Sequence, residues 1–245
     1  MTRSALVTGA SKGIGLGIAT RLASQGYGLT ITARDTERLA VVAEELTRAG
    51  SPDVVVSAGD MADENFAAAL VATHSERFGS MRALVLNAGV GTSGRVADYP
   101  MRRFDKTVAV NLRTPFALLQ ASLPLLRTAA DADLAGGAKV IALASMAGVY
   151  AESGLAVYGA TKAALISMVE ALNAEESGNG VSATAIAPGY VDTDMSAWTH
   201  DRITPETMIK VDDIVELVDG LLKLSSRAVV PKVVMARAGT NGYSA

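Results

Sequence analysis

Residues 4–15, with the sequence SALVTGASKGIG, decide the fold of this chain. Ser4 to Thr8 form a short apolar run typical of a buried strand. After Gly15, apolar residues return at helical spacing, at Ile18, Ala19, Leu22 and Ala23. A turn with three glycines joins the two patterns. The stretch therefore predicts a strand, a glycine-rich turn and a helix in that order.

The glycine-rich turn has the chemistry of a dinucleotide site. Glycine permits a tight bend and a close backbone approach to a pyrophosphate, and the helix N-terminus offers free N–H groups at the positive end of its dipole. The spacing is Gly-x-x-x-Gly-x-Gly, at Gly9, Gly13 and Gly15, and no Gly-Lys-Ser/Thr follows. The phosphate loop of nucleoside triphosphatases is therefore excluded. A glycine-rich turn alone is not specific, so the other motifs decide its meaning.

Apolar runs alternate with helical patterns along the whole chain. The runs with the length of strands lie at residues 5–8, 29–32, 54–57, 83–86, 140–144, 183–187 and near 232–235. This alternation predicts an α/β fold, a doubly wound parallel sheet of about seven strands with helices on both faces. No linker or repeat divides the chain, so we expect a single domain over residues 1–245. Pro231 cannot donate to a ladder, which places the seventh strand at an edge or after this residue.

Composition excludes several classes of protein. A chain of 245 residues with 49% hydrophobic content can bury one sizeable core. Its 22 basic and 25 acidic residues give a net charge of -3, which provides no basic surface for nucleic acid. Without cysteine, disulfides and thiol chemistry are excluded. The apolar runs are too short to span a membrane and no signal-peptide pattern opens the chain, which predicts a cytoplasmic protein with no membrane partner.

The two histidines, His74 and His200, have no ligand-like neighbours in the sequence. We expect both to be ordinary surface residues, which leaves no metal site and no serine–histidine hydrolase. Acid–base chemistry must then come from other side chains.

Tyr158 and Lys162 stand four residues apart and share one face of a predicted helix. A tyrosine with an ordinary pKa of about 10 exchanges protons poorly at neutral pH, whereas a neighbouring ammonium favours the phenolate and lowers the pKa of the phenol. The pair therefore predicts a general acid or base. Tyr-x-x-x-Lys alone is more often an exposed tyrosine beside a solvated lysine, so its companions matter.

Those companions gather at one edge of the predicted sheet. Doubly wound parallel sheets bind ligands outside the carboxyl ends of their strands. The residues at or just beyond those ends are Gly9, Arg34, Asp60, Asn87, Ser145 and Pro188. An accidental scatter of motifs would not be expected to place residues from both halves of the chain at one edge.

In this order, the motifs resemble those of the short-chain dehydrogenase/reductase family, in its compact single-domain type. The matching segments are Thr8 to Gly15, Asn87-Ala88-Gly89, Asn111, Ser145 thirteen residues before Tyr158, Lys162, and Pro188-Gly189-Tyr190-Val191-Asp192-Thr193. They cover most of the chain, and the nearest likeness is to ketoreductases of the 3-oxoacyl-carrier-protein reductase kind. The resemblance implies a Rossmann fold and an oxidoreductase that transfers a hydride between a nicotinamide cofactor and a carbonyl or alcohol substrate.

The resemblance also implies roles for the site residues. Tyr158 would give a proton to the carbonyl, Ser145 would stabilise the developing oxyanion, and Lys162 would lower the pKa of Tyr158 and hold the nicotinamide ribose. Asn111 would relay protons through a water, although an asparagine in an apolar helix can also accompany a local bend. The implied cofactor-binding residues are Gly9, Ser11, Lys12, Gly13, Ile14, Gly15, Arg34, Asp60, Asn87, Ala88, Gly89, Tyr158, Lys162, Pro188, Gly189, Val191 and Thr193.

Some of these residues also have a simpler interpretation. By the resemblance Asp60 would meet the adenine amino group, but taken alone it would be a loop or capping residue. Asn87 is expected to tie neighbouring strands together rather than react. Thr193 would bind the nicotinamide carboxamide.

The end of the second predicted strand decides between the two nicotinamide dinucleotides. Folds that bind NAD place a carboxylate there for the ribose 2′-hydroxyl, whereas NADP needs a cation for its 2′-phosphate. The strand ends at Ala33, and by the family pattern Arg34 and Lys12 suit the phosphate. We expect Asp35 to be the N-cap of the next helix. The sequence therefore favours NADP(H) over NAD(H).

Fewer residues define the substrate side. An apolar pocket, or plain core packing, would involve Met146, Val149, Tyr150, Tyr190, Met195 and Trp198. We expect a substrate lid near residues 190–210, mainly over 192–210. The helix after Tyr158 is apolar on more of its circumference than one sheet face covers, which predicts a homo-oligomer, a dimer or tetramer, unless loops of the same chain cover it. The tail after Met235 departs from the family pattern.

Two other functions fit parts of the sequence. A catalytically silent NADP-binding protein would keep the glycine-rich turn but would not need the full set of Asn111, Ser145, Tyr158 and Lys162. A nucleotide- or S-adenosylmethionine-binding transferase can also open with a strand and a glycine-rich turn, but gains nothing from Tyr-x-x-x-Lys. An assay of NADPH consumption separates the three functions.

Overall fold

The structure, a computed structural model, describes residues 3–243 and contains a parallel sheet of seven strands. The strands are β1 (Ser4–Thr8), β2 (Gly28–Thr32), β3 (Val54–Val56), β4 (Ala83–Leu86), β5 (Ala138–Leu143), β6 (Val181–Pro188) and β7 (Lys232–Met235). All the expected strands are present, and β7 is an edge strand that begins directly after Pro231. Residues 1–2 and 244–245 of the expected domain lie outside the described residues.

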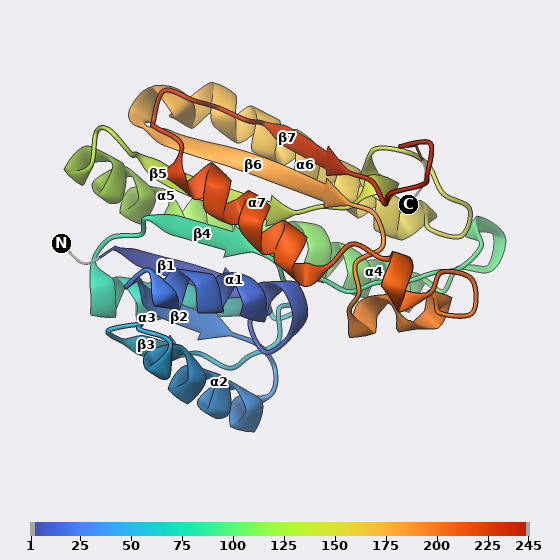
Figure 1. Ribbon diagram of the computed structural model, residues 1–245, viewed down its shortest axis with the longest axis horizontal. Helices are drawn as coiled ribbons and strands as arrows, with labels where there is room; N and C mark the ends of the chain where they lie inside the picture. The colour runs from blue at the N-terminus through green and yellow to red at the C-terminus, as the bar shows by residue number, and fades with distance from the viewer. Residues whose placement is uncertain (1–2, 244–245) are drawn as a thin grey trace.

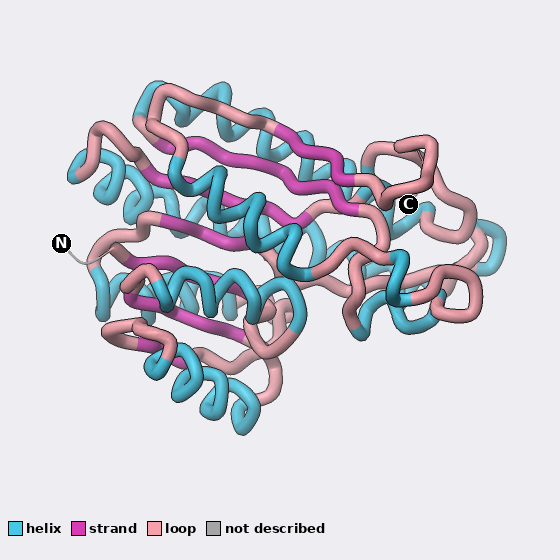
Figure 2. Tube along the Cα trace, viewed as in Figure 1, coloured by secondary structure: helices cyan, strands magenta, loops and turns pink. Residues whose placement is uncertain are grey.

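The strand order is β3-β2-β1-β4-β5-β6-β7, so the chain winds outward in both directions from β1 and β4. β1 pairs with β2 on one side, Ser4 opposite Gly28, and with β4 on the other, Ala5 opposite Ala83. Such a switch point opens a crevice outside the carboxyl ends of the strands. In Figure 2 the loops that follow the strands gather at that edge, together with the C-terminal tail.

Helices cover both faces of the sheet, as Figure 1 shows. One face carries α1 (Gly13–Ser24), α2 (Thr36–Arg48) and α7 (Val211–Lys223), whose core includes Ile18, Leu39 and Val218. The other carries α3 (Phe66–Phe78), α5 (Thr114–Ala132) and α6 (Ala156–Glu176), whose core includes Leu70, Leu118 and Val169. The described part of the chain has no helix that is both long and apolar enough to cross a bilayer.

Local sequence signals explain where several elements begin and end. Asp35 is the N-cap of α2, as predicted, and its carboxylate accepts a hydrogen bond from the backbone N–H of Arg38 at 3.0 Å. Gly79 caps the C-terminus of α3, and its φ of 67° is the left-handed conformation that glycine adopts without strain. α4 (Met101–Val108) runs into α5 through a π-helical turn at Ala109–Arg113, which displaces the residues there from regular helical positions.

His74 corrects one of the sequence predictions, because it is fully buried rather than on the surface. It lies on the inner side of α3, where Nδ1 is 2.8 Å from Thr30 Oγ1 of β2 and Nε2 is 3.1 Å from the Ser80 carbonyl oxygen. Because a carbonyl only accepts, Nε2 carries the proton and Nδ1 accepts from Thr30. Burial lowers the pKa of His74 to about 4, and the Ser80 carbonyl opposes this shift. His200 is exposed, as expected.

Candidate active site

A cleft of about 1130 Å³ follows the carboxyl edge of the sheet. It brings together residues that the sequence places far apart. Its wall includes Gly9, Ser11, Lys12, Gly13, Ile14, Arg34, Asp60, Asn87, Ala88, Gly89, Ser145, Tyr158, Lys162, Pro188, Gly189, Val191 and Thr193. The remaining two predicted site residues, Gly15 and Asn111, lie behind this wall rather than in it.

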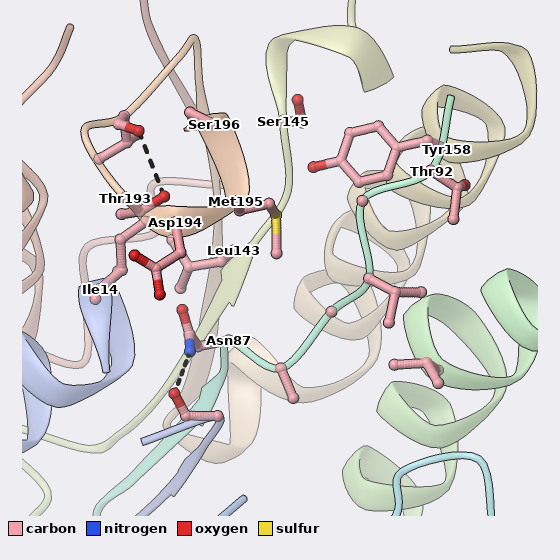
Figure 3. Close-up of a pocket in the computed structure, with 18 of the residues that line it drawn as sticks. Ile14, Asn87, Thr92, Leu143, Ser145, Tyr158, Thr193, Asp194, Met195 and Ser196 are labelled. Carbon is pink, nitrogen blue, oxygen red and sulfur yellow. Dashed lines mark hydrogen bonds between the residues drawn. The ribbon is translucent and has the colours of Figure 1, made fainter. Parts of the chain in front are cut away.

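The glycine-rich turn forms a cradle that has no room for a side chain at Gly9 or Gly15. A Cβ on Gly15 would lie 2.3 Å from the Gly9 carbonyl oxygen and 2.4 Å from Asn87 Nδ2. Asn87 in turn donates to the carbonyls of Thr8, at 2.9 Å, and Gly9, at 3.1 Å, so it ties the end of β4 to the end of β1 as predicted (Figure 3). No side chain caps the N-terminus of α1, which leaves its first N–H groups available to an anion. These features fit the pyrophosphate of a dinucleotide.

Three cations surround the end of the cleft formed by the glycine-rich turn and β2. Arg34 lies exposed on the wall just after β2. Lys12 is turned toward the lid, where its Nζ is 2.6 Å from the carboxylate of Asp194 and keeps the pKa of that carboxyl below its usual value. Arg38, which the sequence analysis missed, also lines the cleft and donates from Nε to the carbonyl of Ser11 at 3.2 Å. The signal for Arg38 was its place in the first turn of the helix that Asp35 caps.

In the structure, Asp60 caps a loop, which is the simpler of the two roles considered for it. Its Oδ1 accepts from the backbone N–H of Ala62 at 2.9 Å, which makes it a loop-capping residue. The side chain nevertheless remains exposed on the cleft wall.

Close backbone packing brings Ser145 to Tyr158. Ser145 begins a short 3₁₀ turn, Met146–Gly148, that rests on α6. A Cβ on Gly148 would lie 2.7 Å from the backbone nitrogen of Ala163, and one on Gly159 would lie 2.5 Å from the carbonyl oxygen of Ala147. Both glycines are therefore needed for this approach. Figure 3 shows the Ser145 hydroxyl and the Tyr158 phenol directed into the same part of the cleft from two different elements.

Lys162 is buried one turn after Tyr158 on α6, with 5% of its surface exposed. Its Nζ donates to the carbonyl of Leu143, at the end of β5, at 2.6 Å and lies 5.7 Å from the centroid of the Tyr158 ring. Burial lowers the pKa of Lys162 to about 8. The ammonium is thus held between the end of the sheet and the ring face.

The predicted lowering of the Tyr158 pKa is wrong for this arrangement. Desolvation raises the pKa of Tyr158, and the hydrogen bond with Ser145 opposes that shift without reversing it. The physical reason is that Lys162 lies over the ring rather than beside the hydroxyl, so its charge does not offset burial. Tyr158 therefore keeps its proton at neutral pH, the state of a proton donor.

Asn111 sits in the π-helical turn between α4 and α5, 1% exposed. Its Oδ1 accepts from the Val90 N–H at 2.8 Å and its Nδ2 donates to the Val90 carbonyl at 3.0 Å. A Cβ on Gly89 would lie 3.4 Å from Asn111 Oδ1 and 3.5 Å from Lys162 Nζ, so the two polar groups flank the same glycine. Asn111 therefore lies in a helical bend and also close to Lys162, so both interpretations of this residue hold.

On the substrate side, half of the predicted apolar residues reach the cleft. Tyr190, Met195 and Trp198 line it, whereas Met146 is buried, Val149 packs against the core and Tyr150 contacts Tyr243 in the tail. Glu152, seven residues after Ser145 in the same loop, also lines the cleft and was missed.

The predicted lid contains two 3₁₀ turns, Asp194–Thr199 and Pro205–Thr207. A β-bridge between Val191 and Ile209 joins its two ends. Across the cleft, a Cβ on Gly91 would lie 3.3 Å from Met195 Cγ and one on Gly13 would lie 3.4 Å from Thr193 Cγ2. In this structure the segment therefore lies over the cleft.

Comparison with known proteins agrees with this geometry. The short chain dehydrogenase family matches residues 3–203. An uncharacterized oxidoreductase of Staphylococcus epidermidis is 36% identical over 195 residues, which span 80% of each chain. An alcohol dehydrogenase of the archaeon Thermococcus sibiricus, solved with 5-hydroxy-NADP, has a TM-score of 0.87 and 28% identity over 100% of this chain and 99% of its own.

A second solved structure, the 3-oxoacyl-[acyl-carrier protein] reductase of Brucella melitensis in complex with NAD, has a TM-score of 0.86 and 27% identity over 96% of this chain and 95% of its own. The extent of the family match and the shared fold lead to one conclusion. The chain belongs to the short-chain dehydrogenase/reductase family, oxidoreductases whose Rossmann-like sheet binds a nicotinamide cofactor.

Proposed function

We propose that this protein is an NADP(H)-dependent ketoreductase, which acts on 3-oxoacyl thioesters or similar ketones. The observation that carries the proposal is a phenol that keeps its proton, Tyr158, directed with the Ser145 hydroxyl into one part of the cleft. The bound nicotinamide supplies the hydride. The carbonyl oxygen would accept hydrogen bonds from Ser145 and Tyr158, and Tyr158 would give it a proton as negative charge develops there.

Lys162 and Asn111 support this step. The Lys162 ammonium, fixed by the Leu143 carbonyl, would hold the ribose hydroxyls of the nicotinamide. Asn111, which like Lys162 lies next to Gly89, would hold the water that returns a proton through Lys162. Their burial keeps bulk water out of the exchange.

Family membership removes the alternative of a nucleotide- or S-adenosylmethionine-binding transferase. The other alternative, a catalytically silent NADP-binding protein, is tested by the variant Tyr158→Phe. This variant keeps the ring, so NADPH binding should remain while turnover of ketones falls by ~10²–10⁴, the effect of losing a general acid. Tyr150→Phe is the matched control, since Tyr150 lies outside the cleft wall. Near-normal turnover by Tyr158→Phe, measured as NADPH absorbance over a panel of ketones and 3-oxoacyl thioesters, would contradict the mechanism.

The preference for NADP(H) is proposed from the cations Arg34, Lys12 and Arg38. A charged hydrogen bond to the 2′-phosphate contributes on the order of 1.5–3 kcal/mol, so Arg34→Ala should weaken NADPH binding by roughly tenfold to a hundredfold, with little effect on NADH. Arg48→Ala, at the far end of α2, is the control. A wild-type protein that binds NADH more tightly would show that the cofactor assignment is wrong.

We also propose that the protein works as a homo-oligomer, a dimer or tetramer paired through α5 and α6. Phe116 on α5 is 54% exposed, and the outer face of α6 presents small residues that include Ala156, Ala160 and Ala163. Small side chains allow two helices to approach closely, and an exposed phenylalanine favours burial against a partner.

A further inference from the structure

The cleft continues beyond Tyr158 into a part lined by aromatic rings and one carboxylate. Tyr190, Met195 and Trp198 come from the segment after β6, and Glu152 comes from the loop after β5. The Tyr190 hydroxyl donates to Glu152 Oε1 at 2.9 Å, and the Tyr190 ring meets Trp198 edge to face with centroids 6.1 Å apart. Two loops that lie far apart in the sequence thus fix one another at this end of the cleft.

Glu152 differs from the neighbouring carboxylates because no cation neutralises it. Asp192 pairs with Lys210 at 3.5 Å and Asp194 pairs with Lys12 at 2.6 Å. Among residues 3–243, Glu152 forms no ion pair with a lysine, arginine or histidine within 4.0 Å. The nearby Arg202 makes no such pair with Glu152: its guanidinium lies 5.5 Å from the centroid of the Trp198 ring, and its charge partly opposes the rise of the Tyr190 pKa.

The hydrogen bond to Glu152 persists over the physiological pH range. Burial and the contact with Glu152 raise the pKa of Tyr190 to about 12, so its hydroxyl stays a donor. Tyr158 also contributes to this rise, and both phenols line the same cleft. Glu152 is therefore held by Tyr190 in the same cleft as Ser145 and Tyr158.

We propose that Glu152 is a specificity-determining residue that selects ketones carrying a protonated amine a few bonds from the carbonyl. The inference rests on the proposed reductase function and narrows its substrate class. An unpaired carboxylate attracts an ammonium through charge, and it repels a carboxylate or phosphate tail. An apolar ring between the carbonyl and the amine would fill the space along Met195 and Trp198.

A series of ketones with similar shapes and different charges tests the proposal. The probes are 1-methylpiperidin-4-one, protonated on nitrogen, neutral 4-methylcyclohexanone, and anionic 4-oxocyclohexanecarboxylate. Wild-type kcat/KM with NADPH should be highest for the cation and lowest for the anion. The cation should exceed the neutral ketone by about fivefold to fiftyfold, less than for a fully desolvated pair because Glu152 is exposed in an open cleft.

Variants assign the preference to this carboxylate. Glu152→Gln keeps an acceptor for Tyr190 but removes the charge, so the cation and the neutral ketone should become equivalent. Glu76→Gln removes the same charge from the exposed side of α3, outside the cleft, and should leave the preference unchanged. Tyr190→Phe keeps the charge but frees the carboxylate, which should reduce the preference without abolishing it. A wild type that favours the neutral ketone, or a preference that survives in Glu152→Gln, would overturn the proposal.

Binding separates this inference from the proposed function. By isothermal titration calorimetry on the NADPH complex, 1-methylpiperidin-4-ol should bind more tightly than 4-methylcyclohexanol to the wild type and equally to Glu152→Gln. Equal affinity of both alcohols for the wild type would refute the charge selection by itself. A protein that prefers the amine in this way but reduces none of the ketones would retain the selective site and refute the reductase function instead.

Discussion

Acidification from about pH 7.5 to pH 5 should lower the free energy of unfolding by about 2 kcal/mol through His74 alone. Burial lowers its pKa from 6.5 to about 4. Because the unfolded chain binds a proton that the folded chain excludes, the stabilisation is complete above pH 6.5 and is lost as the pH falls toward 4. The difference, 6.5 − 4 = 2.5 pKa units, corresponds to about 3.4 kcal/mol in total, of which about 2 kcal/mol is lost by pH 5.

The choice of pH 5 isolates the histidine. The carboxyl groups whose pKa values are lowered in the fold, such as Glu176 and Asp219, have ordinary values of 4.5 and 3.8, so they begin to matter only below that pH. Urea unfolding at the two pH values, followed by circular dichroism, measures the loss. His74→Gln removes the titrating group while keeping an amide for hydrogen bonding, and the chain has one other histidine, the exposed His200.

In His74→Gln the loss between the two pH values should nearly disappear, whatever the variant's absolute stability. His200→Gln should lose as much as the wild type. A loss in His74→Gln equal to that of the wild type would refute the reasoning, since the proton uptake would then belong to another group.

Three further predictions concern the site and the assembly. Gly15→Ala should abolish tight NADPH binding, because the added Cβ would lie 2.3 Å from the Gly9 carbonyl oxygen. Gly220→Ala is the control, since its Cβ would have no atom within 4 Å, and equal NADPH affinities of the two variants, measured by NADPH fluorescence, would contradict the cradle. The rate of ketone reduction should stay level up to pH about 8 and fall above it, since Lys162, with its pKa lowered to about 8, then loses the charge that supports proton return; a rate that rises through pH 8 would exclude this role. Light scattering at micromolar concentration should show an oligomer. Phe116→Glu should dissociate this oligomer, whereas Val41→Glu, on the opposite face, should not. A fully active wild-type monomer would show that one chain covers this surface by itself.

Much of the fold was predictable because its signals are local. The glycine spacing of residues 9–15, the cap at Asp35 and the proline before β7 each act through the backbone of a few neighbouring residues. Strand length and apolar content then determine that the strands are parallel and that β1, β2, β4, β5 and β6 are buried. The meeting of Ser145, Tyr158 and Lys162 in one cleft was predictable for a related reason, since these residues follow strand ends or share one helix face.

The features that the sequence did not predict depend on contacts between residues that are distant in the chain. Helical spacing did not reveal that His74 faces Thr30 and Ser80, because those partners come from another strand and another loop. Likewise, the contact between Glu152 and Tyr190 joins residues 38 positions apart, and no short motif contains both.

The sequence by itself therefore determined most of the residues that line the carboxyl edge, whereas Arg38 and Glu152 were found only in the tertiary structure. The tertiary structure alone decided their protonation and their partners. The pKa of Tyr158 illustrates the division: four-residue spacing places Lys162 one turn away, but the fold buries the phenol and sets the ammonium over the ring, so the pKa rises rather than falls. Desolvation and charge act through space and sum over residues distant in the chain, whereas caps, turns and strand patterns act along it.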